Sequence, residues 1–216
     1  MSAIYFWQDY LQDLPYCRHV LSKFDEIKSE VLQFVSDPNA LVDYPKYKVL
    51  DYWLYDHGWK AIPFSRYEGE FITTEDDSEE SRKLMSIIQK TKSKCPLLSS
   101  ISTPFEEEGH LRNAFISKIE PETVIRPHNG WTSDFLRIHL PVVVDPECKI
   151  TVGTHTQTWE EGKILSFMDG DMHSVKHLGT RDRVVVSVDI RVKYAKKYVP
   201  ELQSFGDVAY RPFSRD

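Results

Sequence analysis

The spacing of hydrophobic residues divides the chain into two parts with different periods. Between residues 20 and 36, apolar residues recur at helical spacing, with charged residues on the opposite face. They are Val20, Phe24, Ile27, Val31 and Phe34. This pattern predicts an amphipathic helix over residues 20–36. From about residue 111 the period falls to two, which is typical of strands with one buried face.

Two further segments precede the change of period. Residues 47–74 mix aromatic and turn-forming residues, which predicts short strands and loops. Residues 73–93 begin with threonine and acidic residues and continue with Leu84, Ile87 and Ile88 on one face. Such a start favours a helix N-terminus, so we expect a second helix with a solvated acidic end rather than a metal site.

Short β-branched and aromatic runs, separated by Pro, Gly, Asn and Asp, fill the second part. They cover residues 112–121, 134–144, 148–153, 155–167 and 182–192. The triplet EEG in the fourth run predicts a hairpin turn. Five or more strands without intervening helices indicate an antiparallel barrel or a double-sheet jelly roll rather than a doubly wound sheet.

Length and composition are those of one globular domain. A chain of 216 residues with 41% hydrophobic residues can bury a sizeable core without division. We therefore expect one domain over residues 1–216. A helical and mixed portion, residues 1–110, is expected to pack on a β core formed by residues 111–192.

The net charge and the absence of long apolar runs restrict the kinds of partner that we expect for the chain. A formal net charge of −6 argues against nucleic acid, and no run approaches the roughly 18 apolar residues that span a membrane. The first residues lack the order of a signal peptide, so we expect a soluble, cytoplasmic protein without a membrane partner. Cys17, Cys95 and Cys148 have no CxxC spacing and are expected to be buried free thiols.

Two histidines stand at strand ends in the β part. His128 follows Pro127 at the end of one predicted strand, and His173 starts another after a loop. Because neutral imidazole is a common ligand of divalent transition metals, the pair predicts a metal site at the mouth of a barrel. The alternative is that both are hydrogen-bonded loop histidines.

Cationic side chains also occupy predicted strands. Arg137 and His139 alternate with apolar residues, so they point together to one face of their strand. Arg183 opens a strongly apolar strand, where a buried guanidinium needs an anionic partner. The alternative for Arg183 is a surface salt bridge with Asp182 or Asp189.

The motifs PHNG, LRIHLP, TWEEGKILSFMDGDMHSV and RVVVSVDI, in this order, resemble the catalytic domain of the aspartyl/asparaginyl β-hydroxylases. These are iron(II)- and 2-oxoglutarate-dependent oxygenases. The resemblance covers residues 111–192 well, and HGWKAIPF fits the upstream region more loosely. It implies a mainly β protein with flanking helices, a double-stranded β-helix of the jelly-roll or cupin-like type, and a hydroxylase that consumes O2.

The resemblance also implies roles for single residues. His128 and His173 correspond to the iron ligands, and Arg183 corresponds to the residue that pairs with the distal carboxylate of 2-oxoglutarate. The positions that match further cosubstrate contacts are Arg137, His139 and Ser117, with Trp59 as a looser match.

Gly130 stands where the wider superfamily has a carboxylate ligand. The resembling family also lacks this acid, so we expect a two-histidine site with water in the third position. Asp134, Asp169 and Asp171 are near enough in sequence to approach the metal or its surroundings. Chloride could fill the open position instead, which would make the chain a halogenase.

The expected substrate is a small polar molecule or an aspartyl- or asparaginyl-type residue in a peptide. Arg66, Arg126 and Lys176 are candidates for binding its acidic group, with solvated surface charge as the alternative for each. Two competing functions are a non-catalytic jelly-roll binding protein and a zinc hydrolase. A zinc hydrolase normally needs a third protein ligand and a general base, and the sequence has no HExxH motif.

Overall fold

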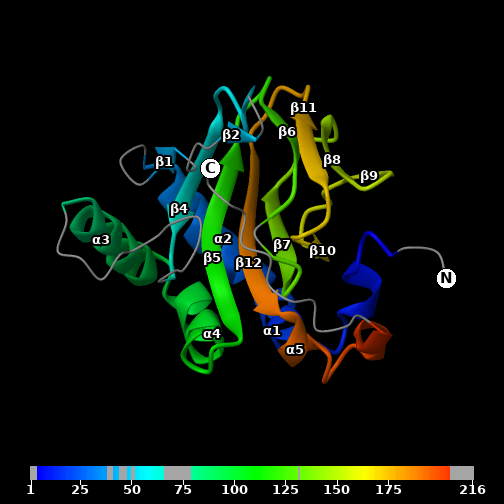
Figure 1. Cartoon of the computed structure of the whole chain (residues 1–216). Coiled ribbons are helices and arrows are strands. Elements are labelled where there is room, and N and C mark those ends of the chain that lie inside the picture. The colour runs from blue at the N-terminus through cyan, green and yellow to red at the C-terminus, as the bar shows by residue number, and fades with distance from the viewer. Residues whose placement is uncertain are drawn as a thin grey trace.

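Two antiparallel sheets face each other, and helices cover the outer side of the larger sheet (Figure 1). The computed structural model describes residues 4–37, 41–43, 48–49, 52–65, 79–130 and 132–204. The larger sheet has the strand order β1-β4-β5-β12-β7-β10, and the smaller sheet has the order β6-β11-β8-β9. This arrangement confirms the mainly β, jelly-roll architecture of the double-stranded β-helix type with flanking helices.

The strands of the larger sheet are β1 (Val42–Asp43), β4 (Trp59–Pro63), β5 (Leu111–Ile119), β12 (Arg183–Arg191), β7 (Phe135–Val143) and β10 (Leu165–Met168). Those of the smaller sheet are β6 (Val124–His128), β11 (His173–His177), β8 (Cys148–Val152) and β9 (His155–Thr158). A separate pair joins β2 (Lys48–Val49) to β3 (Tyr52–Trp53). The helices are α1 (Pro15–Ser22), α2 (Phe24–Val35), α3 (Glu79–Lys94), α4 (Pro96–Glu107) and α5 (Val192–Ala195), with 3-10 turns at Gln8–Tyr10 and Pro200–Ser204.

The long strand β12 lies between β5 and β7 and organises the larger sheet. Its even-numbered residues from Val184 to Ile190 belong to the hydrophobic cluster that includes the helices. Its odd-numbered residues, among them Ser187 and Asp189, lie on the other face, between the two sheets. The same alternation on β7 separates Leu136, Ile138 and Leu140 from Arg137 and His139, as the sequence predicted.

The helix predicted over residues 20–36 is two helices. The chain leaves helical geometry at Lys23, which has φ −122° and ψ 21°. The Ser22 hydroxyl donates to the carbonyl of His19 at 2.8 Å, a local bond that competes with the regular helical ladder. The apolar face was placed correctly, since Val20 and Ile27 are fully buried.

Side chains from neighbouring elements complete the helix ends. Glu30 on α2 accepts the backbone N–H groups of Leu97 and Leu98 at 2.8 and 3.1 Å, which satisfies donors in the first turn of α4. The second predicted helix is confirmed as α3, with Ile88 in the core. Its predicted capping residues, 73–78, lie outside the described residues, as does part of the mixed segment 47–74.

The hairpin predicted at the EEG triplet is wrong. A turn is present, with Lys163 N–H donating to the Glu160 carbonyl at 3.1 Å. However, β9 pairs with β8 and β10 pairs with β7, so residues 159–164 cross from one sheet to the other. The same turn residues occur in a hairpin and in a crossing between sheets. Only the pairing of the flanking strands with distant strands distinguishes the two connections.

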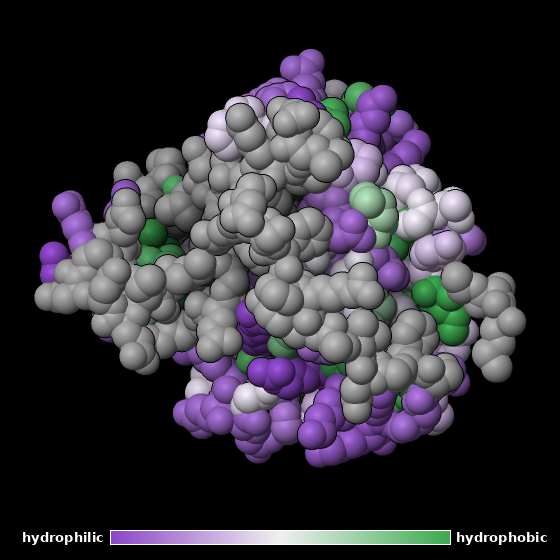
Figure 2. Space-filling view, viewed as in Figure 1, coloured by the Kyte–Doolittle hydropathy of each residue, from purple (hydrophilic) through white to green (hydrophobic). Residues whose placement is uncertain are grey.

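The described residues on the face shown in Figure 2 are largely polar. Figure 2 shows described hydrophobic side chains in small, separate patches on the face in view. Within the described ranges, no helix is long and apolar enough to cross a bilayer. The described cysteines are free and buried, as expected: Cys17, Cys95 and Cys148.

Side chains of the larger sheet that are buried against the helices should contribute more to the free energy of unfolding than exposed side chains of the same type. Leu140 is 2% exposed and Leu32 is 39% exposed. We expect Leu140→Ala to lower the free energy of unfolding by about 2–5 kcal/mol, because it leaves a cavity in the core. The matched change Leu32→Ala should cost roughly 0.5 kcal/mol or less. Urea unfolding followed by circular dichroism measures both, and equal losses would contradict this packing.

Candidate active site

His128 and His173 lie opposite each other on paired strands. They are register partners in β6 and β11, and their ring centroids are 4.1 Å apart. Each residue is only 5% exposed. The structure therefore brings together the two histidines that the sequence singled out, at the end of β6 and the start of β11 in the smaller sheet.

Hydrogen bonds define the tautomer of both rings. Nδ1 of His128 lies 2.8 Å from the carbonyl oxygen of Arg126, and Nδ1 of His173 lies 2.7 Å from that of Asp171. A carbonyl oxygen only accepts, so each Nδ1 carries the proton and each Nε2 keeps its lone pair. This is the arrangement of a metal-ligating histidine whose second nitrogen is held by a backbone carbonyl.

Burial keeps both rings neutral. It lowers the pKa of His128 to about 4, and it lowers the pKa of His173 well below its usual range, with His128 as a further cause. Neutral imidazole is the form that binds metal.

His177 shows the contrast with a structural histidine. Its Nε2 donates to the carbonyl of Arg181 at 2.7 Å, and its Nδ1 accepts the N–H of Gly179 at 3.2 Å. Both nitrogens are therefore occupied by the loop after β11, and neither is available to a metal.

Gly130 has no room for a side chain. A Cβ at this position would lie 1.9 Å from Oδ2 of Asp169 and 2.6 Å from its backbone oxygen. The Asp169 carboxylate thus fills the space into which a residue at position 130 would project. Among the described residues, no group of three or more His, Cys, Asp or Glu side chains is arranged to hold a metal ion.

Two carboxylates surround Arg137. Its Nε and Nη2 each donate to Asp189 at 2.8 Å, and its Nη1 lies 2.9 Å from Oδ1 of Asp169. Asn113 donates to Asp189 as well, at 2.7 Å. Arg137 was expected to contact the cosubstrate; that role stays a prediction, and the structure adds that carboxylates engage three of its nitrogens.

Arg183 is buried without an acidic partner in the described part of the chain. It is 2% exposed, and Nη1 donates weakly to the carbonyl and hydroxyl oxygens of Ser117 at 3.4 and 3.3 Å. Burial lowers its pKa to about 10, and the Cys148 thiol is its other close polar neighbour. The surface salt bridge considered for Arg183 is excluded, because Asp182 pairs with Lys118 and Asp189 pairs with Arg137.

The remaining predicted site residues are His139, Ser117 and Trp59, and each lies near one end of this set of side chains. Phe167, which was not predicted to belong to the site, packs against both His173 and His139, with ring centroids 5.0 and 5.5 Å away. The Trp59 indole donates to the Ser117 hydroxyl at 3.1 Å, and Ser117 contacts Arg183. His139 thus lies one ring away from His173, and Ser117 and Trp59 lie beside Arg183.

Four interior residues were not predicted to belong to the site: Asp189, Trp159, Cys148 and Phe167. Asp189 shares a face with Arg183 and Ser187 through the alternation of β12, so the period of two could have identified it. Trp159 stands in the quoted TWEEG motif but was given no role. Cys148 was treated as an inert thiol, yet it contacts the guanidinium of Arg183.

Apart from Asp169, the described secondary candidates are exposed or only partly buried. Arg126 is tied to Asp56 at 2.6 Å, and Lys176 is exposed. Asp171 contributes its backbone oxygen to His173, and Asp134 closes a turn through its N–H to Thr132. Arg66 lies outside the described residues.

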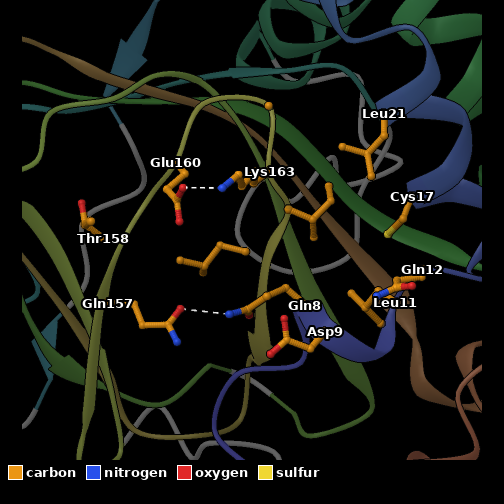
Figure 3. Close-up of a pocket in the computed structure, with 13 residues that line it drawn as sticks. Gln8, Asp9, Leu11, Gln12, Cys17, Leu21, Gln157, Thr158, Glu160 and Lys163 are labelled. Atoms are coloured by element: carbon orange, nitrogen blue, oxygen red, sulfur yellow. Dashed lines mark hydrogen bonds and ion pairs between the residues drawn. The ribbon is translucent and has the colours of Figure 1, made fainter.

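A cavity of about 430 Å³ lies on another side of the molecule (Figure 3). The N-terminal residues and the segment 157–165 line it, and hydrogen bonds and ion pairs already engage several of its polar side chains. Gln8 donates to Gln157, and Lys163 pairs with Glu160. The histidine pair is not among its lining residues.

The fold and the site define a double-stranded β-helix protein with a paired-histidine centre and a buried cationic end. A family model described as aspartyl/asparaginyl beta-hydroxylase matches residues 22–192. The chain therefore belongs to this family.

The chain is also similar to named members of this family. Aspartate beta-hydroxylase domain-containing protein 2 of Xenopus tropicalis is 36% identical over 104 residues, which is 45% of this chain and 28% of that protein. Aspartyl/asparaginyl beta-hydroxylase of Mus musculus is 35% identical over 114 residues, which is 52% of this chain and 15% of that protein. The matches span well under half of each relative. A prolyl-4-hydroxylase structure from Pseudomonas putida has a TM-score of 0.40 at 10% identity, covering 85% of this chain and 96% of that one.

The buried ion pair of Asp189 with Arg137 predicts that replacing Asp189 destabilises the fold much more than replacing Asp182 at the other end of the same strand. Asp189→Asn should lower the free energy of unfolding by about 3 kcal/mol, because it removes one buried carboxylate from Arg137. Asp182→Asn removes an exposed carboxylate from its pair with Lys118 and should cost less than about 1 kcal/mol. Urea unfolding of both variants tests this, and a loss at position 189 no greater than that at 182 would contradict the buried network.

Proposed function

We propose that the chain is an iron(II)- and 2-oxoglutarate-dependent oxygenase that hydroxylates an unactivated C–H bond. The observation that carries the proposal is one interior that holds both a pair of histidines with unprotonated Nε2 atoms and a buried arginine without a described acidic partner. Membership of the hydroxylase family supports the same class of reaction.

The histidine pair fits a divalent metal. Each Nε2 keeps a lone pair, each Nδ1 is held by a backbone carbonyl, and both rings are neutral. His128 and His173 would hold the iron. Two protein ligands leave the other coordination positions to water, cosubstrate and O2.

The other end of the interior fits a dicarboxylate. Nε of Arg183 is buried without a hydrogen-bond partner among the described residues, so its guanidinium has donors to offer. A planar guanidinium suits a carboxylate, and a buried cation gains most from an anionic ligand. Arg183 would bind the distal carboxylate of 2-oxoglutarate, with Ser117, His139 and Trp59 beside it.

Bound together, iron(II) and 2-oxoglutarate supply an oxidation in which one oxygen atom of O2 enters the substrate C–H bond and the other enters succinate, with release of CO2. The protein residues orient and shield the reactants. Arg183 would hold one end of the cosubstrate, the histidine pair would hold the iron at the other end, and the apolar ring of Phe167 packs against His173 and His139. Proton transfer by side chains is not required.

Asp169 would act beside the metal rather than on it. Arg137 holds its carboxylate at 2.9 Å, and its Oδ2 occupies the space at Gly130. A carboxylate at this point also opposes a second anion, so the halogenase alternative loses support. The substrate we propose is an aspartyl- or asparaginyl-type residue in a peptide, or another small polar amino acid, and residues 1–216 are proposed to act as a single oxygenase domain.

The first test is an anaerobic titration of metal-free protein with iron(II) and 2-oxoglutarate. We expect the visible charge-transfer band of the chelated complex in the wild type and in His155→Ala, whose ring is exposed on β9. His173→Ala should lose the band, because it removes a ligand. Addition of chloride should leave the band unchanged; a chloride-dependent shift would favour halogenation. No band in the wild type would reject the oxygenase and favour a non-catalytic binding protein.

The second test concerns the distal carboxylate. Arg183→Met should weaken 2-oxoglutarate binding by roughly 30- to 1,000-fold, which corresponds to about 2–4 kcal/mol for loss of a buried charged partner. Iron binding should stay unchanged, since Arg183 does not touch the histidine pair. The control Arg181→Met alters an exposed guanidinium of the adjacent loop. Equal affinities of the Arg183→Met variant and the wild type for 2-oxoglutarate would remove Arg183 from the site.

A further inference from the structure

Trp159 contacts two of the residues assigned to the cosubstrate. Its indole Nε1 lies 3.1 Å from Nδ1 of His139, and the guanidinium carbon of Arg183 lies 4.7 Å from the centre of its ring. Trp159 itself is 2% exposed. The buried Trp159 side chain therefore contacts both His139 and Arg183 at this end of the interior.

The contact with His139 fixes the position of a proton. An indole N–H can only donate, so Nδ1 of His139 must accept and must lack a proton. In the neutral ring the proton then lies on Nε2. His139 is thus held in the opposite tautomer to His128 and His173, whose Nδ1 atoms carry the proton.

The opposite tautomer suits a different ligand. An Nε2 lone pair binds a metal, whereas an Nε2–H group donates to an anion. No described residue accepts a hydrogen bond from Nε2 of His139. Burial, followed by the nearby Arg183 and Arg137, holds the pKa of His139 well below its usual range, so the ring stays a neutral donor.

The contact with Arg183 stabilises its guanidinium without neutralising it. The face of an indole attracts a cation, but it carries no formal charge that would cancel the positive charge of Arg183. A carboxylate at the same place would compete with an anionic ligand. The ring of Trp159 therefore supports the guanidinium and leaves its charge available.

The backbone around Trp159 is anchored on both sides. The Thr158 hydroxyl donates to the Cys148 carbonyl at 2.9 Å, and Gly162 N–H donates to the Pro141 carbonyl at 3.0 Å. The segment crosses between the sheets here, from β9 to β10. Its neighbours Thr158 and Glu160 line the outer cavity of Figure 3, while the Trp159 ring is buried against His139 and Arg183.

We propose that Trp159 is a positioning residue of the cosubstrate site, which fixes His139 as an Nε2–H donor and supports the guanidinium of Arg183 for the same carboxylate. This inference rests on the proposed function, since it assigns both residues to the distal end of 2-oxoglutarate. The indole N–H and the indole face have separate tasks, so they can be separated by substitution.

The test uses Trp159→Phe, which keeps an aromatic face for Arg183 and removes the N–H donor. Trp53→Phe is the control, because Trp53 is 50% exposed on β3. Two-dimensional ¹H–¹⁵N NMR of histidine-labelled, metal-free protein reports the protonated nitrogen of each ring, and His139→Gln assigns the His139 signals. We expect Nε2–H in the wild type and the control, and a mixture of tautomers or Nδ1–H in Trp159→Phe.

Cosubstrate affinity supplies the second measurement. Trp159→Phe should lower the affinity for 2-oxoglutarate about tenfold, as expected when one hydrogen bond to a charged group is lost through the wrong tautomer. It should change the affinity for 2-oxobutyrate, which lacks the distal carboxylate, by less than about twofold, since that acid makes no contact at this end. If the substitution only disturbed the fold around the site, the affinities for both oxo acids would fall by the same factor.

Three results would overturn the inference. They are an unchanged His139 tautomer in Trp159→Phe, a changed tautomer with unchanged 2-oxoglutarate affinity, and equal losses for both oxo acids. A wild-type protein that binds no 2-oxoglutarate would reject the proposed function and this role with it. The NMR result is independent of cosubstrate binding, so the two failures are distinguishable.

Discussion

The alternation of side chains along β7 and β12 is the constraint on which the rest of the structure depends. Because successive residues of a strand point to opposite faces, each strand delivers one set of side chains to the helices and another to the space between the sheets. The helix-facing set is uniformly apolar, as in Leu136, Ile138 and Val186. The inner set can carry polar groups only because this outer face supplies the hydrophobic burial that stabilises the sheet.

Polar groups between the sheets are costly unless they are paired, and their pairing divides the interior into two regions. Around Arg137, the carboxylates of Asp169 and Asp189 both pair with one guanidinium. At Arg183 the formal charge is +1, and no described carboxylate balances it. The interior therefore holds one guanidinium that is paired with carboxylates, at Arg137, and one that has no described acidic partner, at Arg183, where the proposed dicarboxylate would bind.

Much of this arrangement could be predicted from the sequence. The period of two identified the strands, and the positions of His128 and His173 at strand ends identified the pair. The alternation on β7 placed Arg137 and His139 on the inner face. What the sequence could not indicate depends on long-range pairing. The crossing at residues 159–164 resembles a hairpin locally, and the break at Lys23 lies inside a continuous helical pattern.

The partners of the two arginines show the same limit more sharply. Arg137 and Arg183 look alike as cations on inner strand positions, and Asp189 was considered for the wrong one. Register decides the matter, because β12 places Asp189 opposite Arg137 and places Arg183 opposite Ile119. The direction of the hydrogen bonds to each histidine is a second property that residue spacing does not reveal. Three inner histidines have the same residue type, yet their partners make two of them acceptors at Nε2 and one a donor. A site of this kind is therefore specified by the neighbours of its residues as much as by the residues themselves.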